Sequence, residues 1–161
     1  MRERTTRSLR ALMVMFLLVL VAPKAVVLYG QESHTDQSTA FTIEGNAALW
    51  TVAIKPDRTQ DFESIMTKLR DALRKSEKAE RQQQAAGWKL LKVEKPMPDG
   101  NIVYVHVINP VVRGADYTIL RILYDEFPDE RQALYEQYRS AFVKSLSLAS
   151  GAIVLDLAQA P

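Results

Sequence analysis

Two side chains that can move protons lie close together in this chain, and a third shares their expected strand face. Tyr104 and His106 are two residues apart in a strand-like run, and Asp156 lies in another such run near the C-terminus. Alternate residues of a strand share a face, so Tyr104 and His106 point the same way. A histidine beside a phenol and a carboxylate can take up and release protons near neutral pH. His106, Tyr104 and Asp156 are therefore the candidate catalytic residues.

The same residue types allow other roles. Histidine can be an axial haem ligand, and it can also be a strand residue whose nitrogens bond a neighbour or an interface. Trp88 and Tyr104 can form an aromatic wall around a planar ligand or belong to an interface. Lys92 and a nearby carboxylate can be a simple cross-strand charge pair. We name Trp88, Lys92, Tyr104 and His106 as the candidate ligand-binding residues.

Motifs of high specificity are missing from the sequence. It has no glycine-rich phosphate loop, serine elbow, dinucleotide fingerprint or clustered metal ligands. It has no cysteine, so no disulfide framework forms, and a structural zinc site is not expected. We expect no bound cofactor, with haem through His106 as an alternative.

The clearest structural signal is the stretch from Gly87 to Pro110, which reads as two strands around a turn. We predict a register with Val93 opposite Val105, since burial of one face fixes register. That register puts one apolar set on the face toward the core: Leu91, Val93, Val103, Val105 and Val107. The other face carries Trp88, Leu90, Lys92, Glu94, Tyr104, His106 and Ile108.

The remaining pattern places this hairpin in an α+β fold. A strand is expected over 47–55, a helix from Thr59, a second helix kinked or split at Pro128 that ends near Lys144, and a last strand over 152–157. This order predicts a ferredoxin-like βαββαβ antiparallel sheet with helices on one face, in a single domain over 47–157. The open face would then carry the mixed aromatic set, which is typical of an interface.

On the element order and the hairpin GWKLLKVEKPMPDGNIVYVHV, the chain resembles the dimeric α/β-barrel superfamily, which includes antibiotic-biosynthesis-type monooxygenases and stress-responsive barrel proteins. The resemblance covers about Ala47 to Leu157. It implies a homodimer whose two sheets enclose or border a pocket, and the mixed aromatic face suggests a small apolar or aromatic ligand for it. It also implies several activities, among them cofactor-free oxygenases, haem-handling enzymes and isomerases. It matches no family motif, so no catalytic residue follows from it.

The N-terminus indicates an exported protein. Four arginines within residues 2–10 precede an uncharged apolar run over 11–22, which is typical of a secretory signal over 1–30. An uncleaved membrane anchor over 9–29 is the alternative, and it would be the chain's one membrane contact. Without 1–30, the chain keeps 16 basic and 18 acidic residues, a balance that argues against a nucleic-acid partner. Residues 31–46 read as a disordered lead and 158–161 as a tail.

Together these features predict an exported homodimeric module that binds a small ligand or a protein without catalysis. Two alternatives stay open. One is a cofactor-independent monooxygenase or isomerase that uses His106 with Tyr104 or Asp156 on the open sheet face. The other is a haem-binding protein.

Overall fold

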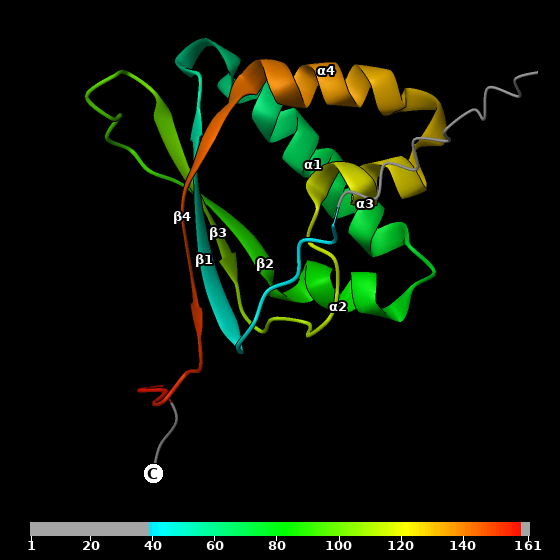
Figure 1. Ribbon diagram of the computed structural model, residues 1–161, viewed down its shortest axis with the longest axis vertical. Coiled ribbons are helices and arrows are strands. Elements are labelled where there is room, and N and C mark those ends of the chain that lie inside the picture. The colour runs from blue at the N-terminus through cyan, green and yellow to red at the C-terminus, as the bar shows by residue number, and fades with distance from the viewer. Residues whose placement is uncertain (1–38, 159–161) are drawn as a thin grey trace, which may run out of the picture. The chain divides into compact units, whose positions relative to one another are not determined.

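The computed structural model describes residues 39–158, and these form an α+β fold with a four-stranded antiparallel sheet and four helices (Figure 1). The predicted signal over 1–30, its anchor alternative and residues 31–38 of the predicted lead lie outside the described residues. No helix within 39–158 combines the length and the apolar character that a membrane span needs.

Along the chain, one strand is followed by two helices, then by two strands, two further helices and a last strand. The strands are β1 (Ala47–Ile54), β2 (Trp88–Lys92), β3 (Ile102–Ile108) and β4 (Phe142–Gly151). The helices are α1 (Thr59–Lys75), α2 (Ala79–Gly87), α3 (Ile119–Glu126) and α4 (Arg131–Ala141), with 3-10 turns at Pro56–Arg58 and Pro128–Glu130. The second helical region is thus divided at Pro128, whose ring disfavours helical geometry in Phe127.

The sheet has the strand order β2-β3-β1-β4, and each neighbouring pair is antiparallel. The two edges are therefore β2 and β4. Figure 1 shows all four helices on one side of the sheet, which leaves the other side open. Across the central pair, Trp50 lies opposite His106 and Val52 lies opposite Tyr104. These four side chains all face the helices.

The face that packs against the helices is the opposite of the one predicted. Tyr104, His106 and Ile108 are fully or almost fully buried with Trp50, Val52 and Ile54. Val103, Val105 and Val107 are only partly buried and belong to the open face. For the hairpin the prediction was wrong: its face with Tyr104 and His106 lies on the same side of the sheet as Trp50 of β1, under the helices.

The hairpin register also differs, by two residues. Leu91, not Val93, lies opposite Val105, and Lys92 lies opposite Tyr104. Val93 instead donates its backbone N–H to the Val103 carbonyl at 2.9 Å. A shift of two residues leaves each face intact but changes every cross-strand partner. Lys92 is consequently opposite Tyr104, whereas the predicted register would have placed it opposite His106.

The C-terminal elements differ from prediction as well. The last helix ends at Ala141, not near Lys144, and the Ala141 carbonyl accepts a hydrogen bond from the Lys55 N–H at 3.0 Å. Residues 142–151 then form β4, which pairs along the whole of β1 with two irregularities in register. The predicted strand over 152–157 lies beyond the sheet and is exposed. β3 pairs with one edge of β1, so only the other edge is available to a last strand. Residues 142–151 occupy that edge, and residues 152–157 therefore have no place in the sheet.

Residues 39–46, predicted as part of a disordered lead, pack against the fold. Phe41 donates its N–H to the Asp116 carboxylate at 3.0 Å and accepts from the Tyr117 N–H at 2.8 Å. Ile43 is buried with Ile108 and Tyr117 in a second, smaller apolar cluster. The prediction relied on polarity and overlooked the apolar spacing of Phe41 and Ile43.

Gly87, the last residue of α2, is expected to tolerate no side chain. A Cβ there would lie 2.5 Å from the Pro110 carbonyl oxygen, and the Gly87 carbonyl accepts a hydrogen bond from Asn109 N–H at 2.8 Å. We predict that Gly87→Ala lowers the free energy of unfolding by about 1–3 kcal/mol because the backbone must shift. Urea denaturation measures this. The exposed neighbour is the control: Ala86→Ser should stay within about 0.5 kcal/mol. Equal midpoints for Gly87→Ala and wild type would contradict the prediction.

Candidate functional site

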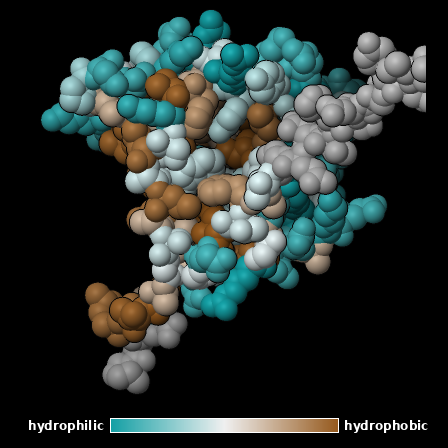
Figure 2. Space-filling view, in the orientation of Figure 1, coloured by the Kyte–Doolittle hydropathy of each residue, from teal (hydrophilic) through white to brown (hydrophobic). Residues whose placement is uncertain are grey.

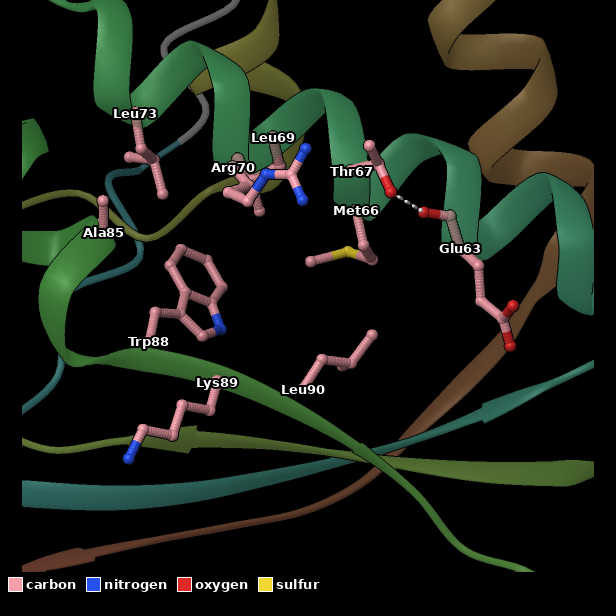
Figure 3. Close-up of a pocket in the computed structure, with 10 residues that line it drawn as sticks. All are labelled: Glu63, Met66, Thr67, Leu69, Arg70, Leu73, Ala85, Trp88, Lys89 and Leu90. Carbon is pink, nitrogen blue, oxygen red and sulfur yellow. Dashed lines mark hydrogen bonds between the residues drawn. The ribbon is translucent and has the colours of Figure 1, made fainter.

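A cavity of about 310 Å³ lies at the β2 edge of the sheet, between β2 and α1 (Figure 3). Its apolar lining comes from both layers, and polar side chains stand at its rim. The lining residues are Glu63, Met66, Thr67, Leu69, Arg70, Leu73, Ala85, Trp88, Lys89 and Leu90. In Figure 3, Trp88 and Leu90 rise from β2 toward α1, whereas Lys89 points away. The cavity is therefore a mainly apolar slot with a tryptophan in one wall.

Helical periodicity on α1 and strand alternation on β2 place the side chains that line this slot. Met66, Leu69 and Leu73 recur at helical spacing on α1 and present one apolar stripe toward the sheet. Trp88 and Leu90 alternate with exposed residues along β2 and so face that stripe. The strand begins directly after α2, so Trp88 stands at one end of the slot, near Ala85.

A polar cluster closes the other end. The Glu63 carboxylate accepts a hydrogen bond from the Tyr104 hydroxyl at 2.5 Å and one from the Lys92 ammonium at 2.8 Å. These bonds lower the pKa of Glu63, and the bond to Glu63 raises the pKa of Lys92. Burial, followed by the bond to Glu63, raises the pKa of Tyr104 to about 12. At neutral pH the cluster is an ion pair with a phenol donor. None of its groups is tuned to exchange protons near pH 7.

His106 lies behind Trp88, deep in the core. It is fully buried and stacks on Trp50 with ring centroids 4.6 Å apart, while Phe62 meets it edge-on at 6.3 Å. Trp88 donates its indole Nε1–H to His106 Nδ1 at 3.0 Å. An accepting Nδ1 places the proton of the neutral ring on Nε2. Among residues 39–158, that Nε2 has no hydrogen-bond partner. Burial lowers the pKa of His106 to about 4, so the ring is neutral at physiological pH.

The predicted site residues are thus partly brought together, on the helix side of the sheet and not on the open face. Trp88 lines the slot, and Lys92 and Tyr104 meet at Glu63 on its rim. His106 contacts Trp88 but is not among the lining residues. Asp156 does not join them: it lies five residues beyond β4, where it accepts a hydrogen bond from Ala158 N–H at 3.0 Å.

Glu63 is the site residue that sequence reasoning missed. Its spacing from Thr67 and Arg70 places all three along one edge of α1, beside the apolar stripe, and this signal was available. Its link to Tyr104 and Lys92 could not be found, because that link depends on the true hairpin register.

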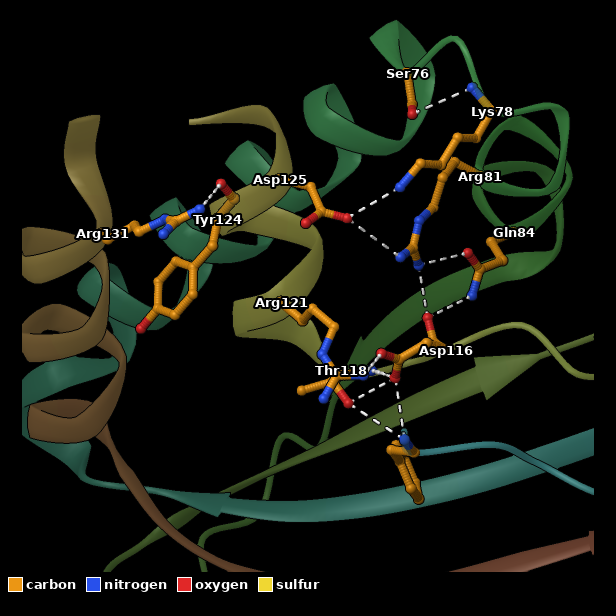
Figure 4. Close-up of polar contacts among 11 residues, drawn as sticks. Ser76, Lys78, Arg81, Gln84, Asp116, Thr118, Arg121, Tyr124, Asp125 and Arg131 are labelled. Carbon is orange, nitrogen blue, oxygen red and sulfur yellow. Dashed lines mark hydrogen bonds and ion pairs between the residues drawn. The ribbon is translucent and has the colours of Figure 1, made fainter. Parts of the chain in front are cut away.

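A second polar cluster, around Asp116, is structural (Figure 4). The buried Arg81 side chain donates to the Asp116 carbonyl at 2.6 Å and to Gln84 at 3.0 Å. The Asp116 carboxylate accepts from Thr118 N–H at 2.9 Å and from Arg121 at 2.7 Å. These bonds join α2 to the loop before α3. Since the groups bond one another, the cluster offers no free group for a ligand.

A second apolar hollow, of about 440 Å³, lies at the opposite edge beside β4, with Phe41, Trp50, Tyr138 and Leu148 in its wall. Across 39–158, no group of three or more acidic, histidine or cysteine side chains could hold a metal ion. Comparisons with protein-family models, with curated proteins and with solved structures find no match to this chain. The function must therefore be argued from the geometry of the slot.

The buried histidine predicts a specific pH dependence of stability. The folded pKa of about 4 lies below the ordinary value of 6.5, so the unfolded chain binds the proton first as pH falls. Stability should be unaffected above about pH 7 and should decrease from pH 6.5 toward pH 4, by about 3 kcal/mol in all. The pKa values of Glu63 and Asp116 are lowered in the folded chain, so protonation of these two carboxylates reduces stability only at lower pH.

Urea denaturation between pH 5 and pH 7 measures this slope. His106→Gln is the matched control, because its side-chain oxygen can still accept from Trp88 while it cannot titrate. The slope should disappear in that variant. Parallel curves for wild type and His106→Gln would show that another group is responsible.

Proposed function

We propose that this protein is a non-catalytic binding module whose slot between α1 and β2 takes a small apolar or aromatic molecule. The observation that carries the proposal is the slot itself, an apolar cavity at a sheet edge with Trp88 as one wall. Its volume of about 310 Å³ is at the lower end of the range of ligand pockets, about 300–1,000 Å³. An aromatic ligand could pack on the indole, and Arg70 and Glu63 at the rim could bond its polar end.

The ionisation states of the polar groups at the end of the slot support binding over catalysis. Glu63 is held as a carboxylate and Tyr104 as a phenol, and both pKa values are moved away from neutrality. A general base works best when its pKa is near the working pH. The alternatives of an oxygenase or isomerase and of a haem protein both require His106 to reach a ligand. Its full burial between Trp50 and Trp88 supports neither alternative.

The proposal extends to assembly and location. The order β2-β3-β1-β4 with helices on one side supports a ferredoxin-like arrangement of the kind found in dimeric α/β-barrels. An open face that carries Leu49, Leu91 and three valines supports a homodimer that covers it. The basic, then apolar, N-terminal sequence supports export.

Binding of the neutral dye N-phenyl-1-naphthylamine tests the slot. We expect its fluorescence to rise with the wild-type chain and its affinity to fall about tenfold in Leu90→Gln, because an apolar wall of the slot is lost. Leu91→Gln is the matched control: Leu91 is the next residue, but it lies on the open face. Dye affinity should be unchanged in that variant.

Met66→Gln on α1 repeats the test from the opposite wall of the slot, and denaturation midpoints verify that each variant is folded. Equal loss of dye affinity in Leu90→Gln and Leu91→Gln would place the dye elsewhere, and unchanged affinity in both would exclude the slot as its site.

A further inference from the structure

We propose that residues 152–157 of each copy pack on the open face of a second copy, so that the C-terminal segment of one subunit covers the sheet of the other. This inference rests on the homodimer of the proposed function and deepens it, since it names the segment and the surface that form the interface.

The segment is apolar and has almost no cover within one chain. Ile153, Val154, Leu155 and Leu157 are between 50% and 95% exposed. Figure 2 shows the segment as a hydrophobic cluster at the lower left, past the end of the sheet. Its sequence, AIVLDL, is rich in β-branched residues and leucine, which is why it is predicted to be a strand. A strand-forming segment without a neighbouring strand needs a partner surface.

The open face offers a matching surface at the end where the segment begins. Leu49 of β1 and Leu91 of β2 are about half exposed on this face. A hollow of about 450 Å³ lies at Leu49, with Val107, Ala149 and Ile153 also in its wall. Ile153, the second residue of the segment, therefore already borders the apolar surface that we assign to the partner's segment. The hollow shows that one copy leaves this surface incompletely filled.

Direction favours a second copy over the chain's own sheet, and the length of the segment is sufficient to cover that copy's sheet. Gly151, the last residue of β4, pairs with Ala47 at one end of the sheet, and the segment continues from there beyond the ends of the strands. Covering its own face would require the chain to reverse direction. Six extended residues reach about 20 Å, which exceeds the width of a four-stranded sheet at about 4.8 Å between strands. A copy facing the sheet presents its surface within that reach.

Charge is complementary as well. Asp156 is the one charged residue of the segment, and it lies among exposed apolar residues. The charged side chains that the strand registers assign to the open face are Lys89, opposite Val107, and Lys144, opposite Ala53. A carboxylate that arrives with the partner's segment meets opposite charge at Lys89, whereas Lys144 already interacts with the Asp99 carboxylate of the β2–β3 turn. The pairing with Lys89 favours this docking over one against an acidic surface.

The absence of native cysteine allows a direct test in the full chain. Leu155→Cys is placed in one chain, and Leu49→Cys, Leu91→Cys or Val107→Cys is placed in a second chain with a tag of different size. The two chains are co-expressed and oxidised. A disulfide needs Cα atoms about 4–7 Å apart, so we expect a covalent heterodimer with at least one of the three open-face positions.

Glu136→Cys is the control partner for Leu155→Cys, because Glu136 is exposed on α4, on the helix side of the sheet. It should give less heterodimer by about tenfold or more, because docking of the segment on the open face does not bring the thiol of Leu155→Cys near this position. Equal amounts from open-face and control positions would overturn the inference, as would no heterodimer with any of them. A chain carrying both Leu155→Cys and Leu49→Cys that yields only a fast-migrating monomer would overturn it too, since its segment would cover its own sheet.

Amine crosslinking of the wild-type chain separates this inference from the homodimer. A crosslinked dimer without any Leu155→Cys heterodimer would leave the homodimer standing and exclude the role of the segment. A wild-type chain that stays monomeric under amine crosslinking, together with no Leu155→Cys heterodimer, would overturn both.

Discussion

The fold depends on how one histidine is enclosed. His106 at the centre of β3 stacks on Trp50 of the neighbouring strand and accepts a hydrogen bond from Trp88 of the other neighbour. One side chain thus joins the three strands β1, β3 and β2 on the face that the helices cover. Burial of a charged imidazole is costly, so the ring of His106 stays neutral, and it can both stack on Trp50 and accept the Trp88 hydrogen bond. The position of Trp88, and with it one wall of the slot, follows from this contact.

That constraint assigns different roles to the two faces of the sheet. The face with the aromatic rings lies under the helices, and its margin at β2 leaves the slot with the Glu63, Tyr104 and Lys92 cluster at one end. The other face holds smaller, β-branched side chains without a helix over them. A module built in this way can bind a ligand at its edge and a second copy on its open face, because Trp88 and Leu90 of the slot and Leu49, Leu91 and Val107 of the open face lie on opposite sides of the sheet.

Sequence reasoning was successful for the class of the fold and for which hairpin residues share a face, but not for Asp156, which lies beyond the sheet. Strand alternation correctly grouped Tyr104 with His106 and Val103 with Val105. It could not determine which group is buried, because both faces of the hairpin are rich in apolar residues and the decision depends on the pairing of β3 with β1. The last strand was misplaced for a related reason. Two adjacent segments had strand character, and local propensity does not determine which one occupies the free edge of β1. Glu63 was missed because its contacts are long-range.

The most direct measurement of the central claim is the protonation of the His106 ring, observed by nitrogen-15 NMR of the imidazole. The account predicts a neutral ring with the proton on Nε2 and an unprotonated Nδ1 that accepts from the Trp88 indole. Those signals should stay unchanged from pH 8 to about pH 5. A ring that titrates with a midpoint near its ordinary pKa of 6.5, or one protonated on Nδ1, would contradict it.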